Sequence, residues 1–196
     1  MKPSGPLTSD RILEAAEDVL RRFGPDKTTV VDVARQLGVS HGSVYRHFPS
    51  KVALRDAVAE RWLDRISRPL ADIAARSGPA ADRLREWMLR LATAKRELAG
   101  SDPELFATYF RLTSESRGVG AAHEEHLARQ LSGIIADGVR AGEFTVDDPE
   151  RSGWAVFRAS ARFNHPLHAA EWNRPGFEAD LADLCDLLLR GLKTEG

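Results

Sequence analysis

The segment from Thr28 to Leu54 constrains the fold of this chain more than any other. Its sequence, TTVVDVARQLGVSHGSVYRHFPSKVAL, contains two short helical patterns separated by a glycine turn. The first pattern begins near Thr29, where Thr29 and Asp32 have the spacing of a capping box, and it ends at Gly38. Ser40 is placed to cap the second pattern. Two short helices joined in this way predict a helix-turn-helix.

Apolar residues recur at a spacing of three and four along almost the whole chain, and strand signals are nearly absent, so we expect an all-α fold. A first amphipathic helix is predicted to follow the capping candidates Thr8 and Ser9 and to end at Gly24-Pro25. Ser50 caps a fourth, longer helix, which Pro69 is expected to bend or end. The later helices, which bring the expected total to about nine, are predicted near 80–98, 103–116, 119–141, 149–169 and 174–192.

Composition sets the class of protein and its compartment. The chain has 196 residues, of which 42% are hydrophobic, and this is ample for a globular core. The single cysteine, Cys185, excludes an internal disulfide, and no apolar run approaches the roughly 18 residues that span a bilayer. The N-terminal residues also lack the apolar stretch of a signal peptide. We therefore expect a cytoplasmic protein.

The second helix of the motif has two chemically different sides. At 100° per residue, Val44 and Phe48 share one side, while Gly42, Ser43 and Arg46 lie on the other. Between Lys27 and Lys51 there are four basic residues and one acid, although the whole chain has a net charge of −1. An exposed helix with a cation, hydroxyls and little apolar surface suits the major groove of DNA. The residues suited to phosphate contacts are Thr28, Thr29, Ser43, Tyr45, His47 and Lys51.

The pattern T-T-x-x-x-[VI]-A-x-x-L-G-V-S-x-G-x-x-Y-x-H-F-x-x-K-x-x-L resembles that of the tetracycline-repressor (TetR) family of bacterial regulators. The resemblance runs from about Ile12 to Leu54. It implies a homodimeric, all-helical repressor that leaves a palindromic operator when its larger C-terminal domain binds a small molecule. His41 and Arg46 fall at positions that vary across the family, so they are the candidates for operator specificity. The DNA contacts carried over by position are Thr29, Ser40, His41, Gly42, Ser43, Tyr45, Arg46, His47 and Lys51.

Two domains follow from the motif and the resemblance. Residues 1–54 are predicted to form the helix-turn-helix DNA-binding domain, which continues into a connecting helix at 50–69. Residues 70–196 are predicted to form the helical effector-binding and dimerisation domain. The apolar face of the last helix is broader than one neighbour needs, and the resemblance implies a four-helix dimer interface from helices near 149–169 and 174–192. Burial of this face within one subunit is the alternative.

Aromatic residues of the C-terminal helices are candidates for an effector pocket, since small-molecule sites are mostly apolar with a few polar anchors. Ordinary core packing is the alternative for each of them. The polar anchors considered are Asn164, His165 and Arg111. The aromatic candidates are Trp87, Phe106, Tyr109, Phe110, Trp154, Phe157 and Phe163.

Four of the six histidines form two pairs at a spacing of three, His123/His126 and His165/His168. Such pairs can bind zinc, with Glu124 and Glu125 near the first pair, and they would make the chain a metal-binding regulator or a metal-assisted hydrolase. The first pair lacks the H-E-x-x-H spacing of zinc hydrolases, and the sequence contains no Gly-rich phosphate loop or nucleophile elbow. We therefore expect no enzyme, no cofactor and no metal site. A regulator that has lost its effector is a third possibility.

Overall fold

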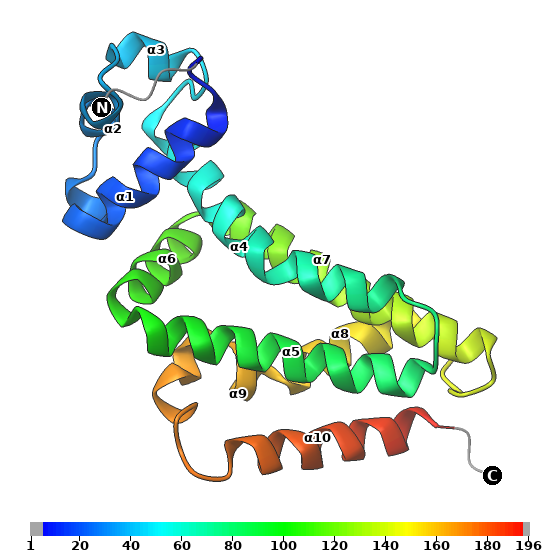
Figure 1. The fold of residues 1–196 in the computed structure, drawn as a ribbon. Helices are drawn as coiled ribbons and strands as arrows, with labels where there is room; N and C mark the ends of the chain where they lie inside the picture. The colour runs from blue at the N-terminus through cyan, green and yellow to red at the C-terminus, as the bar shows by residue number, and fades with distance from the viewer. Residues whose placement is uncertain (1–5, 194–196) are drawn as a thin grey trace. The chain divides into compact units, whose positions relative to one another are not determined.

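The computed structural model describes residues 6–193, apart from the side chain of Arg117. This part of the chain is helical, as predicted, and its one β-contact is an isolated bridge between Phe144 and Lys193 (Figure 1). No helix in it is both long and apolar enough to cross a membrane. The helices are α1 (Ser9–Lys27), α2 (Val30–Leu37), α3 (His41–Tyr45), α4 (Lys51–Ala75), α5 (Ala80–Ser101), α6 (Pro103–Glu115), α7 (Arg117–Arg140), α8 (Pro149–Ala159), α9 (Ala161–Asn164), the 3₁₀ helix η1 (Pro166–Glu171) and α10 (Phe177–Leu192).

The helices gather into two compact units. Unit 1 contains the described residues up to Leu63 together with Asp102–Gly120, and unit 2 contains Asp64–Ser101 together with the described residues from Ala121 onward. Unit 1 therefore includes α6 as well as the helix-turn-helix. These units are defined by contacts, whereas the domains expected from the sequence divide the chain by function, and that division stays a prediction.

Unit 1 is organised around α1, against which α2 packs (Figure 1, blue). Ile12 and Val19 of α1 and Val33 of α2 are all fully buried. Thr8 caps α1 by accepting a hydrogen bond from the Arg11 amide, as its position predicts. The helix is interrupted at Gly24, where φ is 72° and ψ is 168°, and a further turn then runs to Lys27. Only glycine adopts this backbone conformation at low cost, which explains why the helix is interrupted at the predicted Gly24-Pro25 position.

Helix α6 is joined to the rest of unit 1 by an aromatic stack and by ion pairs. Trp62 of α4 stacks on Tyr109 at a centroid distance of 4.7 Å and meets the edge of Phe106 at 6.2 Å. Arg111 pairs with Asp26 at 3.0 Å. The start of α6 is fixed by Asp102, whose carboxylate accepts a hydrogen bond from the Leu105 amide at 3.0 Å, as the Asp-Pro sequence predicts.

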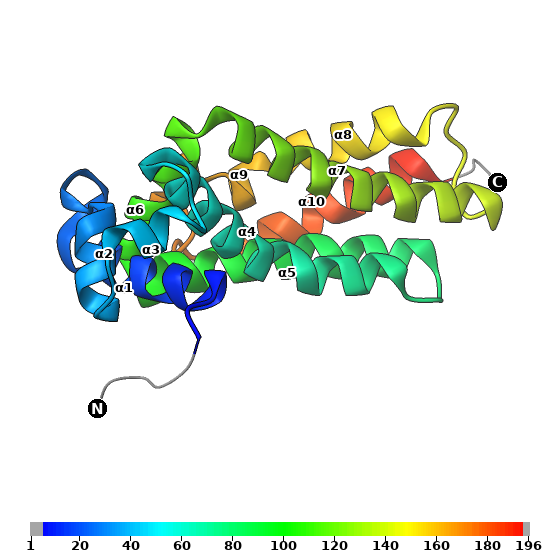
Figure 2. The same ribbon diagram turned by 90° about the horizontal axis from the view of Figure 1, so that it is seen from above.

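Unit 2 is a set of long helices: α10 runs beside α5, and the hydrogen bond between Trp87 and Gln130 joins α5 to α7 (Figures 1 and 2). Their apolar faces supply the core, with Leu84 and Leu91 of α5, Leu131 of α7 and Leu181 of α10 all buried. Arg83 is buried as well. Its guanidinium donates to the Ala74 carbonyl and to Asp137, each at 2.9 Å, so the charge is compensated.

Of the two alternatives expected at Pro69, a bend or an end of the helix, the structure excludes the end: helix α4 continues to Ala75. Proline removes only one amide donor there, and the burial of Leu70 and Ile73 stabilises the continuing helix. The predicted helix over 149–169 is instead α8, α9 and η1. It breaks near Ser160, whose carbonyl accepts a hydrogen bond from the Asn164 side chain.

Helices α7 and α8 approach so closely at Gly153 that no side chain fits. A Cβ atom on Gly153 would contact the Ser132 hydroxyl and lie 2.7 Å from the Ser132 backbone nitrogen and 2.9 Å from its Cα. We expect Gly153→Ala to lower the free energy of unfolding by about 1–3 kcal/mol, since the helices must move apart. Urea unfolding measures the effect.

The matched control is Gly133→Ala, a helical glycine of α7 with nothing within 4 Å of its Cβ position. This substitution should stabilise the protein by roughly 0.5–1 kcal/mol, because alanine is the better helix former. Equal effects of the two substitutions would argue against the close contact.

Candidate functional site

The turn between α2 and α3 is built from local hydrogen bonds. The Thr29 hydroxyl accepts from the Asp32 amide at 3.2 Å, and the Asp32 carboxylate accepts from the Thr29 amide at 3.1 Å, which completes the predicted capping box. The hydrogen bond from the Thr29 hydroxyl is the main cause that lowers the pKa of Asp32. At the other end of α2, Gly38 takes a left-handed conformation with φ of 68° and turns the chain into α3.

Helix α3 has one buried and one exposed side, as the helical wheel predicts. Val44 is fully buried and Phe48, in the turn after α3, is 9% exposed, so these two side chains hold the helix against the core. Ser40 caps the helix by accepting a hydrogen bond from the Ser43 amide at 3.2 Å. The exposed residues are His41, Gly42, Tyr45, Arg46 and His47.

Side chains on the exposed side of α3 are linked to one another. The hydroxyls of Ser40 and Ser43 lie 2.9 Å apart, and an Arg46 Nη2–H donates to the Ser43 hydroxyl at 3.3 Å. The rings of His41 and Tyr45 meet edge to face with centroids 6.4 Å apart. The groups expected to meet DNA are therefore partly fixed in the free protein.

The predicted phosphate contacts differ in exposure. Thr29 is exposed at the start of α2, and Lys51 is exposed at the start of α4. Thr28 is instead buried, and its hydroxyl donates to the Gly24 carbonyl at 2.7 Å. The Thr28 hydroxyl therefore stabilises the end of α1 from inside the protein.

The aromatic candidates for the effector pocket are divided between the two units. Phe106, Tyr109 and Phe110 belong to unit 1, where Phe106 and Tyr109 pack on Trp62. The candidates in unit 2 are Trp87, Trp154, Phe157, Phe163, Asn164 and His165.

The candidates in unit 2 have internal partners. Trp87 donates its indole N–H to the Gln130 carbonyl oxygen at 2.8 Å. The Asn164 amide donates to the Ser160 carbonyl and hydroxyl at 2.9 and 2.8 Å. Whether any of these residues also binds an effector stays a prediction.

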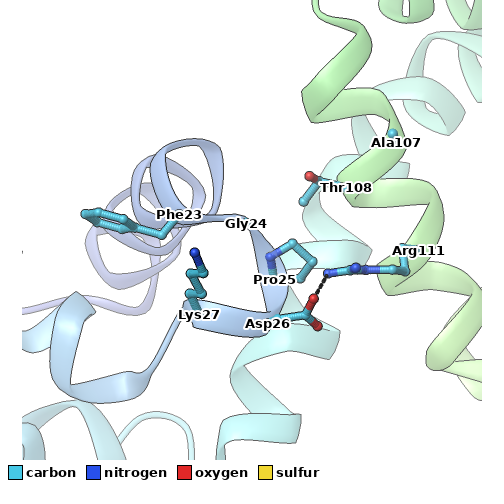
Figure 3. A pocket seen from close by; sticks show the side chains of 8 residues that line it. All are labelled: Phe23, Gly24, Pro25, Asp26, Lys27, Ala107, Thr108 and Arg111. Atoms are coloured by element: carbon cyan, nitrogen blue, oxygen red, sulfur yellow. Dashed lines mark ion pairs between the residues drawn. The ribbon is translucent and has the colours of Figure 1, made fainter.

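Unit 1 contains an open groove that the sequence did not predict. It has a volume of about 400 Å³ and lies where the interrupted end of α1 faces α6 (Figure 3). Phe23, which is 54% exposed, lies at this groove, and the Asp26–Arg111 ion pair crosses it. Its lining residues are Phe23, Gly24, Pro25, Asp26, Lys27, Ala107, Thr108 and Arg111.

A row of polar side chains connects α5 and α7 inside unit 2. Gln130 of α7 accepts the Trp87 hydrogen bond and donates to the Ser67 carbonyl at 3.3 Å. Lys95 of α5 is only 6% exposed, and burial lowers the pKa of its ammonium to about 8 against the opposing attraction of Glu124. Lys95 is eight residues after Trp87, so the two residues lie on the same face of the helix. A charged residue on the apolar face was therefore the sequence signal for this row.

The two histidines of the first pair have different surroundings. Burial is the main cause that lowers the pKa of His123 to about 3, and the charges of Lys95 and His126 act in the same direction. The His123 Nε2 atom is buried without a hydrogen-bond partner. His126 is exposed, and its Nε2 atom lies 2.9 Å from the amide nitrogen of Gln130.

The histidine pairs give no support to the metal alternative. Among the described residues there is no group of three or more His, Cys, Asp or Glu side chains that could hold a metal ion. In the second pair, His165 Nδ1 accepts a hydrogen bond from the Leu167 amide at 3.3 Å and so caps η1. His168 Nδ1 lies 3.6 Å from a carboxylate oxygen of Glu171, Oε1.

A helix-turn-helix with an exposed second helix, attached to a larger helical unit, defines the class of DNA-binding transcriptional regulators. The chain belongs to the TetR family of bacterial regulators. The family described as "Bacterial regulatory proteins, tetR family" matches residues 12–58, and "Tetracyclin repressor-like, C-terminal domain" matches residues 80–185.

Individual relatives agree with this assignment. The chain is 27% identical to the uncharacterized HTH-type transcriptional regulator Rv1255c of Mycobacterium tuberculosis over 76% of this chain and 71% of the relative. It is 27% identical to the HTH-type transcriptional repressor KstR2 of Rhodococcus jostii over 84% of this chain and 79% of the relative. The fold matches the transcriptional regulator FadR of Bacillus subtilis, solved in complex with stearoyl-CoA, with a TM-score of 0.65 and 17% identity over 94% of this chain and all of that one.

Proposed function

We propose that the protein is a ligand-responsive transcriptional repressor that binds a palindromic operator as a homodimer in the cytoplasm and has no enzymatic activity. The observation that carries this proposal is the two-sided α3, with Val44 enclosed and Arg46 exposed. A short helix anchored in this way can enter the major groove without uncovering the core. The similarity to the repressor KstR2 supports repression rather than activation of transcription.

In this proposal each exposed residue has one of two roles. His41 and Arg46 meet base edges: His41 lies in the N-terminal part of the recognition helix, which lies deepest in the groove, and Arg46, at the C-cap of α3, reaches the bases with its long side chain. Thr29 and Lys51 lie at the N-termini of α2 and α4 and bind phosphates, where the amide groups and the helix dipole also favour an anion. Phosphate contacts fix the register, while the base contacts select the sequence.

The dimer is supported by apolar surface that unit 2 leaves uncovered. Phe177, Leu181, Cys185 and Leu189 of α10 are buried within the chain, but Leu187 on the same helix is 60% exposed. A second copy of α10 would cover this surface and would give the two-fold interface expected from α8, α9 and α10. Two recognition helices would then enter successive major grooves roughly 34 Å apart.

The effector acts by favouring one spacing of the recognition helices. A small molecule bound in the C-terminal region lowers operator affinity only if it binds the non-DNA-binding conformation more tightly. FadR, a structural neighbour, was solved with stearoyl-CoA, and this supports a small-molecule effector here. Trp154 and Phe157 of α8 are half-buried and remain the proposed aromatic contacts.

Substitutions on the exposed surface should separate the two roles. Lys51→Ala is expected to weaken binding to operator and random DNA alike and to lower the salt dependence, the slope of log K against log salt, by about one. Arg46→Ala or His41→Ala should weaken operator binding by about 1–3 kcal/mol and relax preference at particular base pairs. An operator selected from random DNA, followed by binding measurements at several salt concentrations, gives both quantities.

The control is Arg129→Ala, which removes an exposed cation of α7 that pairs with Glu125. It should leave both affinities unchanged. Equal losses on operator and random DNA for Lys51, Arg46 and His41 would contradict the division of roles. If the protein selects no palindrome at low salt, the proposed function itself fails.

A further inference from the structure

The start of α1 is hydrogen-bonded to the turn that follows α3. The Ser9 hydroxyl lies 3.2 Å from His47 Nδ1, although the two residues are 38 positions apart in the chain. Both belong to unit 1. His47 is exposed, and along the chain it lies between Arg46 and Lys51, which make base and phosphate contacts in the proposed function. A hydrogen bond at this place decides how the imidazole is presented to DNA.

The Ser9 hydroxyl is not used to cap α1. Both Thr8 and Ser9 are capping candidates in the sequence, but Thr8 is the N-cap and accepts the hydrogen bond from the Arg11 amide at 3.3 Å. Ser9 is therefore the first residue of the helix, where its side chain can bond outside its own helix. Its contact with His47 is such a bond, so helix capping does not account for this hydroxyl.

The two segments that carry this bond are each held in place. Beside Ser9, Asp10 accepts from Arg61 of α4 through its carboxylate at 3.1 Å and its backbone carbonyl at 3.3 Å. In the turn after α3, the His47 and Phe48 amides both donate to the Val44 carbonyl at 3.0 Å. The bond therefore joins two fixed segments, and little entropy is lost in orienting the imidazole.

A partner on Nδ1 decides what the other ring nitrogen presents. A neutral imidazole has one N–H donor and one acceptor nitrogen, and its neighbours select between the two tautomers. When the Ser9 O–H donates to Nδ1, the ring proton of His47 is on Nε2. The two nitrogens point in different directions, so this N–H points away from the serine. A phosphate oxygen accepts from such a donor, whereas the lone pair of the other tautomer would be repelled.

We propose that Ser9 is a positioning residue for DNA binding: its hydroxyl donates to His47 Nδ1 and thereby holds the Nε2–H ready for a backbone phosphate. The inference rests on the proposed function, in which the exposed surface around α3 meets DNA. Ser9 itself does not touch DNA. Because every sequence carries the same phosphates, Ser9 contributes to affinity and not to the choice of base pairs.

Ser9→Ala tests this role in the full-length protein, on the selected operator and on a random duplex. We expect the affinity for both to fall by about threefold to tenfold, since the imidazole is no longer held in the donating tautomer. Ser9→Thr keeps the hydroxyl at an exposed position and should bind like the wild type. The matched control is Ser114→Ala, which removes an exposed hydroxyl of α6 that donates to the Phe110 carbonyl at 2.8 Å. It should change neither affinity.

A double-mutant cycle separates positioning from a structural effect on α1. His47→Ala should weaken binding to both DNAs, because the phosphate contact is removed. In that background Ser9→Ala should cause no further loss, since no ring remains to be positioned. A general loosening of α1 would instead lower the affinity by the same factor in both backgrounds.

The tautomer can be measured in the wild-type protein without a variant of Ser9. In protein with isotopically labelled histidine at about pH 8, the chemical shifts of the ring nitrogens show which one carries the proton. His47→Ala identifies the resonances. We expect the proton on Nε2 in the wild type and a mixture of tautomers in Ser9→Ala. If Ser9→Ala does not fold, as judged by circular dichroism, the wild-type tautomer remains the test.

Four results would overturn the proposal. They are wild-type affinity in Ser9→Ala, equal weakening in Ser9→Thr and Ser9→Ala, equal losses with and without His47, and a His47 proton on Nδ1. The proposed function is judged separately, on the wild-type protein. Selection of a palindrome together with any of the four results refutes this inference and leaves the proposed function standing, whereas failure to select a palindrome refutes the proposed function itself.

Discussion

Replacing Trp62 with alanine is expected to lower the free energy of unfolding by about 3–5 kcal/mol, the usual cost of removing a buried aromatic side chain. Trp62 is 4% exposed, and its ring lies parallel to that of Tyr109 within 5°. The edge contact with Phe106 adds to this packing. The loss is large because the indole contacts two of the three aromatic residues of α6, Phe106 and Tyr109.

Urea unfolding followed by circular dichroism measures this effect, since the substitution removes a fluorophore. Trp62→Phe should cost less because an aromatic ring remains. Val52→Ala, at a position of α4 that is 63% exposed, is the control and should change the free energy of unfolding by about 0.5 kcal/mol or less. A loss below about 1 kcal/mol for Trp62→Ala would mean that the aromatic stack does not hold α6 in unit 1.

Acid should destabilise the protein through His123. Burial lowers the pKa of this imidazole to about 3 in the folded chain, whereas the ordinary value is 6.5. Between these two values the unfolded chain binds one proton that the folded chain does not, so stability is fully present above pH 6.5 and is lost as the pH falls toward 3. The loss attributable to His123 should approach about 1.4 kcal/mol per pH unit near pH 5.

The measurement is the free energy of unfolding in urea at a series of pH values, for the wild type and for His123→Leu. As the pH falls, the free energy of unfolding of the variant should decrease less steeply than that of the wild type. The difference in slope should correspond to about one bound proton. His126→Gln is the matched control, because it removes an exposed imidazole from the same helix. Parallel pH profiles for the wild type and His123→Leu would show that the imidazole is accessible to protons in the folded state.

The helix-turn-helix could be predicted from sequence because the forces that define it are local. Thr29 and Ser40 each cap a helix by bonding an amide three residues away, and Gly38 supplies the left-handed turn in between. The periodicity that places Val44 inward also involves only neighbouring residues. No knowledge of distant partners was needed for the exposed surface of α3.

The sequence was least informative where distant residues decide the outcome. Pro69 lies within α4 because Leu70 and Ile73 are buried, which the local sequence does not reveal. Phe106 and Tyr109 pack on Trp62, a partner more than forty residues earlier that no local pattern reveals. Periodicity identifies an apolar face without identifying what covers it.

The buried polar row was missed for a related reason. Lysine and glutamine are mostly exposed in proteins, so sequence alone favours a surface position for Lys95 and Gln130. The charge at an apolar helical position was visible, but its burial depends on the approach of α7 to α5. The spacing of His123 and His126 suggests one shared face, whereas the structure gives the two imidazoles different surroundings.

The hydrogen bonds that join Ser40, Ser43 and Arg46 affect how operator preference can change. A substitution at Ser43 would alter the start of α3 and the position of the Arg46 guanidinium together. The energetic effects of changes at positions 43 and 46 should therefore not add in a double-mutant cycle. A new operator preference would then require compensating pairs of substitutions, which makes single-step divergence at this surface slow.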